Sequence, residues 1–342
     1  MEIEKIETNL KRNLLLHSSH VKFHTNDKRI GTSIIRVNSE FTFQEILGFG
    51  GALTESSCYI LSKINKDLSN QILEEYFSKD KLNYNFCRIS IGSCDFSLNS
   101  YSYSYENDLS DFTIHRDMKY VIPIIKTTQK LNKKLQILSS PWSPPAFMKD
   151  NHSLIGGGRL LPQYKKLWVE YLVKYVLSYQ NQGIPIHYMT IQNEPNAKQI
   201  WESCNYSSSE EADLLKNYLS PIFRKKGIHT RFLIWDHNKD VILERSIQTL
   251  IDNNTLDYSS GIAFHWYTGG HFDSLEKLHQ LFPNQLLFHT EGCTGYSHFR
   301  PQDEQANAEM YAYEIIEDFN HGVNSFIDWN IVLDFKRRSK SR

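Results

Sequence analysis

The chain has 342 residues, of which 40% are hydrophobic and 23% are charged, and its formal net charge is −1. A charge this close to zero argues against a protein that binds nucleic acid or an anionic membrane through electrostatic attraction. The composition excludes collagen, coiled coils and disordered chains. The length suits one large α/β barrel of about 200–250 residues or two smaller domains. Aromatic residues make up 13% and suit sugar stacking as well as core filling.

The N-terminal sequence and the cysteines bear on the cellular compartment. No apolar run approaches the roughly 20 residues of a membrane helix, and the only apolar cluster near the start is Leu14 to Leu16. The five cysteines cannot all pair with one another, and none forms a Cys-x-x-Cys motif. We therefore expect a cytoplasmic protein with reduced thiols and no transmembrane segment.

Residues 1–45 form the first predicted region. Two short extended runs, HVKFH (20–24) and SIIRV (33–37), predict strands outside the main fold. Such strands need a partner sheet, because an isolated pair is marginally stable in water. We expect them to belong to an accessory β-domain.

Residues 46–334 form the second predicted region, in which strand-like and helix-like segments alternate. This order is typical of a parallel α/β fold. Eight apolar segments predict the strands, at 46–53, 84–92, 135–140, 186–193, 231–236, 261–267, 285–292 and 324–333. Eight strands with intervening helices favour a (β/α)8 TIM barrel. The alternative, a doubly wound open sheet, lacks a G-x-G-x-x-G motif after its first strand.

Apolar spacing predicts the intervening helices. They are expected at Asp67–Phe77, Asp117–Leu131, Tyr164–Tyr179 and Gln305–Phe319. Pro123 either bends the second of these or lies in its first turn, and Gly183 lies just beyond the end of the third. Ser208 and Glu211 have the spacing of a capping box.

The tract 97–108 is polar and carries tyrosines at alternate positions. We interpret it as a surface loop, and the alternative is that Tyr101, Tyr103 and Tyr105 stack on a ligand.

Two glutamates lie where predicted strands end. Glu194 follows the fourth strand in QNEP, and Glu291 ends the seventh in HTEG. In a barrel such positions meet at one mouth, and a pair of carboxyl groups is what glycoside hydrolysis requires. Each glutamate taken alone is more often a surface or salt-bridged carboxylate. Asn193, directly before Glu194, is suited to bond a sugar 2-hydroxyl.

Other strand ends supply groups that suit a sugar pocket. Arg88 lies among apolar residues and requires an anion, either a catalytic carboxylate or a structural partner. Asp95 follows the second strand and is suited to bind sugar hydroxyls, and Trp142 lies between prolines as a possible platform. His265 and Tyr267 end the sixth strand. Without HExxH or a Cys/His cluster, we expect His265 to form hydrogen bonds rather than to bind metal. Trp329 on the eighth strand completes the predicted pocket.

These motifs resemble a known family. GFGGALTES, RISIGSCDFS, LSSPWSPPAFMK, IQNEP, WESC, AFHWY, HTEGC and DWNIVL occur in the order found in glycoside hydrolase family 30, which includes acid β-glucosylceramidases. The resemblance covers roughly residues 45–334. It implies a retaining β-glycosidase with a (β/α)8 barrel that acts on β-glucosides, glucosylceramide included. β-1,6-Glucanase and β-xylosidase are alternatives within the same family.

The resemblance also implies roles for individual residues. Glu194 is the expected acid/base and Glu291 the nucleophile. Asp95, Trp142, Asn193 and Trp329 are expected to contact the sugar, with Arg88, His265 and Tyr267 around the nucleophile. The expected pKa of Glu194 is raised by burial and by the charge of Glu291. Two carboxyl groups suffice for this chemistry, so no cofactor and no metal are expected.

The end of the chain departs from the family pattern. Family members usually continue into a last helix and a β-sandwich, whereas here a basic tail, residues 335–342, follows Asp334. We expect an incomplete accessory domain, and a homo-oligomer that covers the exposed apolar edge. The alternative function is an inactive barrel that only binds carbohydrate or glycolipid.

Overall fold

The computed structural model describes residues 2–22, 38–294 and 304–334. The chain divides into two compact units, Met1–Phe43 and Gln44–Arg342. Each unit is described by itself.

The first unit contains an antiparallel hairpin of β1 (Glu2–Asn9) and β2 (Leu14–Lys22), joined by the short 3-10 turn η1 (Leu10–Arg12). Most of its side chains are exposed on both faces, so neither strand has the apolar alternation that marks a half-buried strand. The predicted run HVKFH overlaps only the end of β2. The predicted run SIIRV and the basic tail lie outside the described residues.

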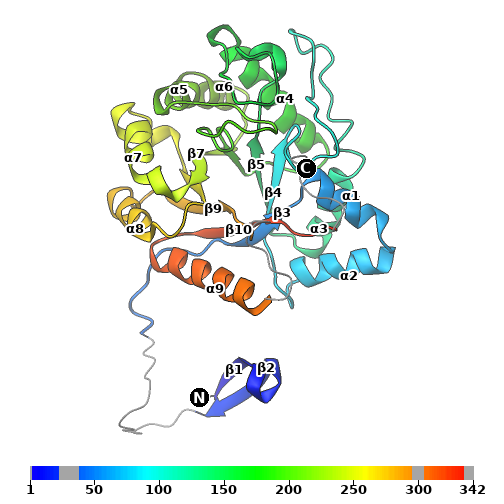
Figure 1. The fold of residues 1–342 in the computed structure, drawn as a ribbon, viewed down its shortest axis with the longest axis vertical. Coiled ribbons are helices and arrows are strands. Elements are labelled where there is room, and N and C mark those ends of the chain that lie inside the picture. Colours follow the sequence, from blue (N-terminus) through cyan, green and yellow to red (C-terminus); the bar gives the residue numbers. More distant parts are fainter. Residues whose placement is uncertain (1, 23–37, 295–303, 335–342) are drawn as a thin grey trace. The chain divides into compact units, whose positions relative to one another are not determined.

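The second unit is a closed barrel of eight parallel strands in the order β10-β3-β4-β5-β6-β7-β8-β9 (Figure 1). The predicted (β/α)8 barrel is therefore confirmed. Its strands are β3 (Gly48–Ala52), β4 (Phe86–Ile91), β5 (Gln136–Pro141), β6 (Tyr188–Thr190), β7 (Arg231–Asn238), β8 (Gly261–His265), β9 (Leu286–Glu291) and β10 (Ser325–Asn330). Every predicted barrel strand overlaps one of these.

Helices surround the strands (Figure 1). The α-helices are α1 (Glu55–Lys63), α2 (Lys66–Phe77), α3 (Val121–Leu131), α4 (Lys165–Asn181), α5 (Ser208–Asp213), α6 (Ser220–Lys225), α7 (Ile242–Ile247), α8 (Phe272–Leu281) and α9 (Glu304–Asn320). Two π-helical segments, η4 (Leu214–Leu219) and η6 (Gln248–Asp252), link α5 to α6 and extend α7. The remaining short turns are η2 (Ala146–Met148), η3 (Pro162–Tyr164), η5 (Lys239–Val241) and η7 (Leu256–Tyr258).

One packed layer of side chains joins seven of the barrel strands. Its members, one each from β4 to β10, are Phe86, Leu138, Tyr188, Leu233, Ala263, Phe288 and Ile327. All are buried, as expected for a barrel interior filled by side chains. β3 contributes glycine instead, because a Cβ on Gly50 would lie 2.3 Å from the carbonyl oxygen of Phe86.

The helix boundaries follow the local signals with one correction. Pro123 lies in the first turn of α3, where its missing N–H has no intrahelical partner. Gly183 follows α4 with a φ of +77°, which suits glycine. The predicted capping box is wrong by one residue: Ser207 and Glu210 form it. Glu211 is instead buried, and it bonds the Trp235 backbone N–H and pairs with Arg245.

The tyrosine tract is a loop, but two of its tyrosines are buried rather than on the surface. The hydroxyls of Tyr101, Tyr103 and Tyr179 donate to Asp117 at 3.1, 2.5 and 2.7 Å. Burial raises the pKa of Asp117 to about 6, although these hydrogen bonds oppose the shift. Tyr105 is 66% exposed. The tyrosines therefore organise the loop around a buried carboxyl group.

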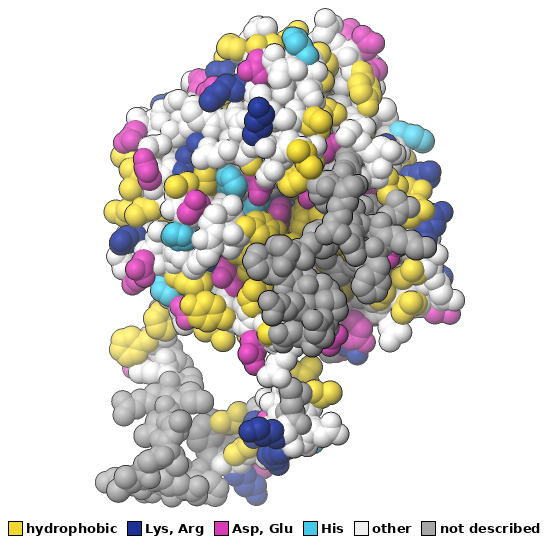
Figure 2. Space-filling model, in the orientation of Figure 1, with side chains coloured by type: hydrophobic (Ala, Val, Ile, Leu, Met, Phe, Trp, Pro, Cys, Tyr) yellow, Lys and Arg dark blue, Asp and Glu magenta, His cyan; other side chains and the backbone are white. Residues whose placement is uncertain are grey.

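The described surface is mixed in charge. Figure 2 shows acidic, basic and hydrophobic side chains interspersed over the described part of the face it displays. None of the described helices has both the length and the apolarity to span a membrane. All five cysteines are free, and only Cys293 is not fully buried.

Candidate active site

Arg88 is the centre of a buried polar network. It lies on β4 and is fully buried. Its guanidinium donates to Glu291 Oε2 at 2.5 Å, to Asn193 Oδ1 at 2.8 Å and to Asp236 Oδ2 at 2.9 Å. Its Nε also donates to Ser140 Oγ at 3.2 Å. The predicted anion for Arg88 is therefore a pair of carboxylates from two different strands.

Glu291 ends β9 and is held by two donors. Arg88 bonds one carboxylate oxygen, and the Tyr267 hydroxyl donates to the other at 2.9 Å. Tyr267 is 40% exposed as a residue, but its hydroxyl points to Glu291. Hydrogen bonds from a cation and a hydroxyl favour the ionised form of a carboxyl group. The arrangement thus fixes the position of both carboxylate oxygens of Glu291.

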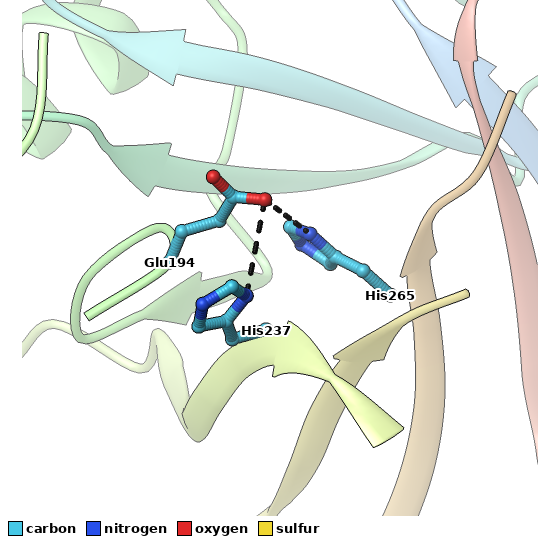
Figure 3. Close-up of side chains that lie close together, drawn as sticks. All are labelled: Glu194, His237 and His265. Carbon is cyan, nitrogen blue, oxygen red and sulfur yellow. Dashed lines mark ion pairs between the residues drawn. The ribbon is translucent and has the colours of Figure 1, made fainter. Parts of the chain in front are cut away.

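Glu194 follows β6 and has a different set of partners. Its Oε1 lies 3.4 Å from Nδ1 of His265 and 3.8 Å from Nδ1 of His237 (Figure 3). Its Oε2 accepts from Gln199 at 3.4 Å. The residue has a φ of +47°, and its backbone N–H donates to the carbonyl of Asp236 at 2.9 Å. A left-handed backbone at a non-glycine residue is typical of functional sites.

Asp236 is a central residue that the sequence did not single out. Its carboxylate accepts from Arg88, from the hydroxyls of Thr190 and Thr290 at 2.6 Å each, and from His265 Nε2 at 3.1 Å. Burial raises its pKa, but Arg88 and the bond from His265 hold the pKa well below the ordinary range. Its position at the end of the fifth predicted strand was the available signal.

A bulge in β7 produces this placement. The register with β8 shifts between Trp235 and His237, and both Trp235 and Asp236 have positive φ, +75° and +54°. A bulge redirects side chains and is over-represented next to active sites. Here it turns Asp236 toward Arg88 and brings His237 to Glu194. His237 is therefore a second residue that sequence reasoning missed.

The predicted pKa shift of Glu194 is wrong in direction. Burial raises the pKa, but the polar contact with His265 and the charges of His265 and His237 outweigh it, so the pKa lies below its usual value. Burial lowers the pKa of His265, whereas the charge of Glu291 and the contacts with Asp236 and Glu194 raise it to about 9. The proton of this pair therefore resides on His265 in the unliganded protein.

Asp95 and Asn193 offer polar groups that the protein itself leaves available. Asp95 Oδ1 is buried and has no hydrogen-bond partner among the described residues. Burial, followed by the charges of Glu291 and Glu194, raises its pKa well above the ordinary value. Asn193 accepts from Arg88 through its oxygen, so its amide N–H groups face away from that bond. Both residues adjoin the glutamates, as expected for groups that bind sugar hydroxyls.

Trp142 and Trp329 stack on each other rather than standing alone. Their ring centroids are 5.5 Å apart with an interplanar angle of 17°. The guanidinium carbon of Arg88 lies 4.9 Å and 5.4 Å from the two centroids. Both indoles are at least 96% buried. They therefore form a wall that packs against Arg88, and the structure joins all nine predicted site residues into one neighbourhood.

Two groups of described residues have the donor types of a metal site. One consists of Glu194, His237 and His265, and the other of His289, Glu314 and Asp318. The second group surrounds the buried Nζ of Lys239, which pairs with Glu314 and with Asp318 at 3.5 Å. The ammonium already supplies the positive charge there.

The barrel thus places two carboxyl groups at its strand ends, one beside an arginine and one beside two histidines. This arrangement is typical of glycoside hydrolases. The glycosyl hydrolase family 30 TIM-barrel domain matches residues 46–339. The chain belongs to this family.

Similar proteins agree with the assignment. Putative glucosylceramidase 4 of Caenorhabditis elegans is 31% identical over 92% of this chain, and the chain spans only 64% of that relative's length. The crystal structure of SrfJ from Salmonella typhimurium superimposes with a TM-score of 0.93 at 33% identity, over 97% of this chain and 75% of that one. The endo-beta1,6-glucanase BT3312 gives 0.81 at 29% identity, over 87% and 68%.

Proposed function

We propose that the protein hydrolyses β-glucosides by double displacement, with Glu291 as the nucleophile and Glu194 as the acid/base. The observation that carries the proposal is the unequal surroundings of the two carboxyl groups. Arg88 and Tyr267 donate hydrogen bonds to the two oxygens of Glu291, whereas Glu194 adjoins a histidine from which it can receive a proton. Paired groups with environments that separate their protonation are typical of acid–base and nucleophile assignments.

In the first step, a carboxylate oxygen of Glu291 attacks the anomeric carbon of the sugar. The bond between that carbon and the leaving oxygen breaks, and Glu194 gives its proton to the leaving oxygen. Because the proton resides on His265 in the free protein, it passes to Glu194 when the substrate displaces water. The products of this step are a free alcohol and a glycosyl ester on Glu291.

In the second step, Glu194 is ionised and acts as a base. It takes a proton from water, and the water oxygen attacks the anomeric carbon as the ester bond to Glu291 breaks. Asp95 and Asn193 bind sugar hydroxyls throughout, and the wall of Trp142 and Trp329 holds Arg88 in place. The protein returns to its starting charge, with the proton again on the Glu194–His265 pair.

Relatives at about 30% identity support the proposed substrate class. The glucosylceramidase relative supports a β-glucoside with a lipid aglycone. An endo-acting β-1,6-glucanase is the second candidate, because the structure of BT3312 matches most of the barrel. A β-xylosidase is a further alternative within the family.

The proposal is tested with a chromogenic β-glucoside. Wild-type protein is expected to release the chromophore, and Glu291→Gln is expected to lose at least about 10³-fold in rate because the nucleophile is gone. Glu276→Gln, an exposed change on α8, is the matched control and should retain full activity. A 2-deoxy-2-fluoro glucoside should leave a stable adduct on Glu291, detected by peptide mass spectrometry.

Parallel assays on glucosylceramide, β-1,6-glucan and a β-xyloside separate the candidate substrates. Turnover of one of them, lost in Glu291→Gln, assigns the class. If folded wild-type protein hydrolyses none of these substrates but still binds glucosides in calorimetry, the proposal is overturned in favour of a carbohydrate-binding barrel.

A further inference from the structure

Three potential metal ligands converge beside the proposed acid/base. They are Nδ1 of His237, Nδ1 of His265 and Oε1 of Glu194 (Figure 3). The two nitrogen-to-oxygen distances are 3.8 and 3.4 Å, and all three atoms lie within 4.8 Å of one another. Two ligands bound to zinc at about 2.0–2.1 Å in tetrahedral geometry are about 3.3 Å apart. The observed spacing therefore needs only small side-chain rotations to enclose an ion.

Both nitrogens can serve as ligands once the ion displaces the proton from His265. Both Nδ1 atoms are buried, and neither makes a well-formed hydrogen bond to a described residue. A buried ring nitrogen without such a partner is uncommon in a folded protein. Each nitrogen lies in a longer ion-pair contact with Oε1 of Glu194.

The outer surroundings also suit a metal. Nε2 of His265 bonds Oδ1 of Asp236 at 3.1 Å, and Asp236 is itself held by Arg88 and two threonines. Ligating histidines almost always bond a carboxylate or carbonyl through their second nitrogen, which fixes the ring and points the first nitrogen at the ion. His265 is held in this way before any ion arrives.

We propose that His237, His265 and Glu194 form a binding site for one divalent transition-metal ion of the zinc type, and that its occupation blocks the acid/base. Two imidazoles and one carboxylate are donors that suit zinc. The cluster at Lys239 carries no such proposal, because an ammonium occupies it.

Occupation has a defined chemical consequence, which rests on the proposed function. An ion bound to Oε1 of Glu194 prevents that oxygen from carrying the proton for the leaving group. Glu291 remains paired with Arg88 and Tyr267. The ion is therefore a reversible inhibitor of the first step rather than a cofactor.

Binding is tested without reference to activity. Zinc chloride alone is titrated into the chelator-treated protein by calorimetry at mildly alkaline pH, where protons compete less for the ligands. One ion per chain is expected. Cobalt(II) in its place should give the intense visible absorption of a four-coordinate site. His237→Gln and Glu194→Gln should each weaken binding by at least about tenfold, whereas His115→Gln, an exposed control, should leave it unchanged.

The binding measurements test the metal site independently of the proposed enzymatic function. Failure of wild-type protein to bind zinc or cobalt, or equal binding by folded His237→Gln and Glu194→Gln, overturns the site whatever the activity. Circular dichroism and thermal melting establish that the variants are folded. If the protein hydrolyses a glucoside, zinc should inhibit the wild type and EDTA should restore the rate. The zinc concentration for half inhibition should rise at least about tenfold in His237→Gln, and an unchanged value overturns the inhibitory role.

Discussion

The guanidinium of Arg88 bonds the carboxylate of Glu291 across the barrel. The two residues lie on β4 and β9, which β3 and β10 separate in the strand order. The same guanidinium also bonds Asp236 on β7. One buried cation thus connects three strands, and its positive charge compensates two buried carboxylates.

Replacing Arg88 by Gln should lower the free energy of unfolding. Breaking a buried ion pair by removing one partner costs about 3–5 kcal/mol, because the remaining charge stays buried and uncompensated. Urea unfolding measures the loss, and Arg88→Lys, which keeps the charge but loses the forked bonds, should lose less. A loss below about 1 kcal/mol in Arg88→Gln would show that the network contributes little to stability.

Replacing Tyr267 by Phe should affect catalysis more than stability. The change removes the hydroxyl that donates to Glu291, while the partly exposed ring remains. We expect kcat/KM on a β-glucoside to fall about 10–100-fold, and the free energy of unfolding to change by about 1 kcal/mol or less. Equal losses in both Tyr267→Phe and the distant Tyr105→Phe would contradict a specific role.

The stability of the fold should depend on pH through His265. The fold raises the pKa of His265 from an ordinary value of about 6.5 to about 9. The protonated form is therefore favoured in the folded state, so its contribution is complete below about pH 6.5 and is lost as pH rises through 9. Melting temperatures measured across this range should fall in the wild type and fall less in His265→Gln. A flat profile in the wild type contradicts the shift.

The proposed catalysis should also decline at alkaline pH, over the range in which His265 loses its proton. The free protein needs the proton shared by Glu194 and His265, and kcat/KM reports the free enzyme. The pair titrates as a unit, so kcat/KM should fall as pH rises through about 9. In His265→Gln the fall should begin at lower pH, because Glu194 then holds the proton alone. An unchanged alkaline limit in that variant would remove His265 from the proton path.

Lys239→Met should destabilise the outer layer of the barrel. Lys239 is fully buried between Glu314 and Asp318, and the latter also bonds His289 at 2.6 Å. Removing the ammonium leaves these acids buried together, at an expected cost of about 3–5 kcal/mol. Chemical unfolding measures the cost, and Lys277→Met on the exposed face of α8 is the control. Similar small losses in both variants would contradict the role of Lys239.

The apolar strands and their polar ends were predictable because barrel geometry links them. A segment such as 285–292 shows by its composition that it is buried, and the residue at its end must then reach the mouth. The position of Glu291 could therefore be predicted from the sequence, and Arg88 could be predicted because it is a charged residue within an apolar strand. The capping box was misplaced because three serines and two glutamates permit two registers, and only the buried pairing of Glu211 selects one.

The roles of Asp236 and His237 could not be predicted from the sequence, because they depend on the backbone conformation of β7. Asp236 ends an apolar strand as Glu291 does, but its contact with Arg88 depends on two consecutive left-handed residues in β7. The direction of the Glu194 pKa shift depends on the positions of His265 and His237, and the bulge in β7 supplies the second of these. Likewise, Tyr101 and Tyr103 are buried with their hydroxyls bonded to Asp117, which lies more distant in the sequence.

The side-chain layer that includes Phe86, Leu138 and Tyr188 determines from which side of the barrel small molecules can reach the site. It spans β4 to β10 and fills the barrel, and close-packed interiors leave few voids larger than a water molecule. In the proposed reaction, the substrate, the hydrolytic water and both products must therefore enter and leave on the loop side. The alcohol released first must vacate the route by which water enters. In the proposed mechanism, a bulky alcohol that departs slowly blocks the entry of water and returns to the glycosyl ester more often, so net hydrolysis should slow as the aglycone becomes larger.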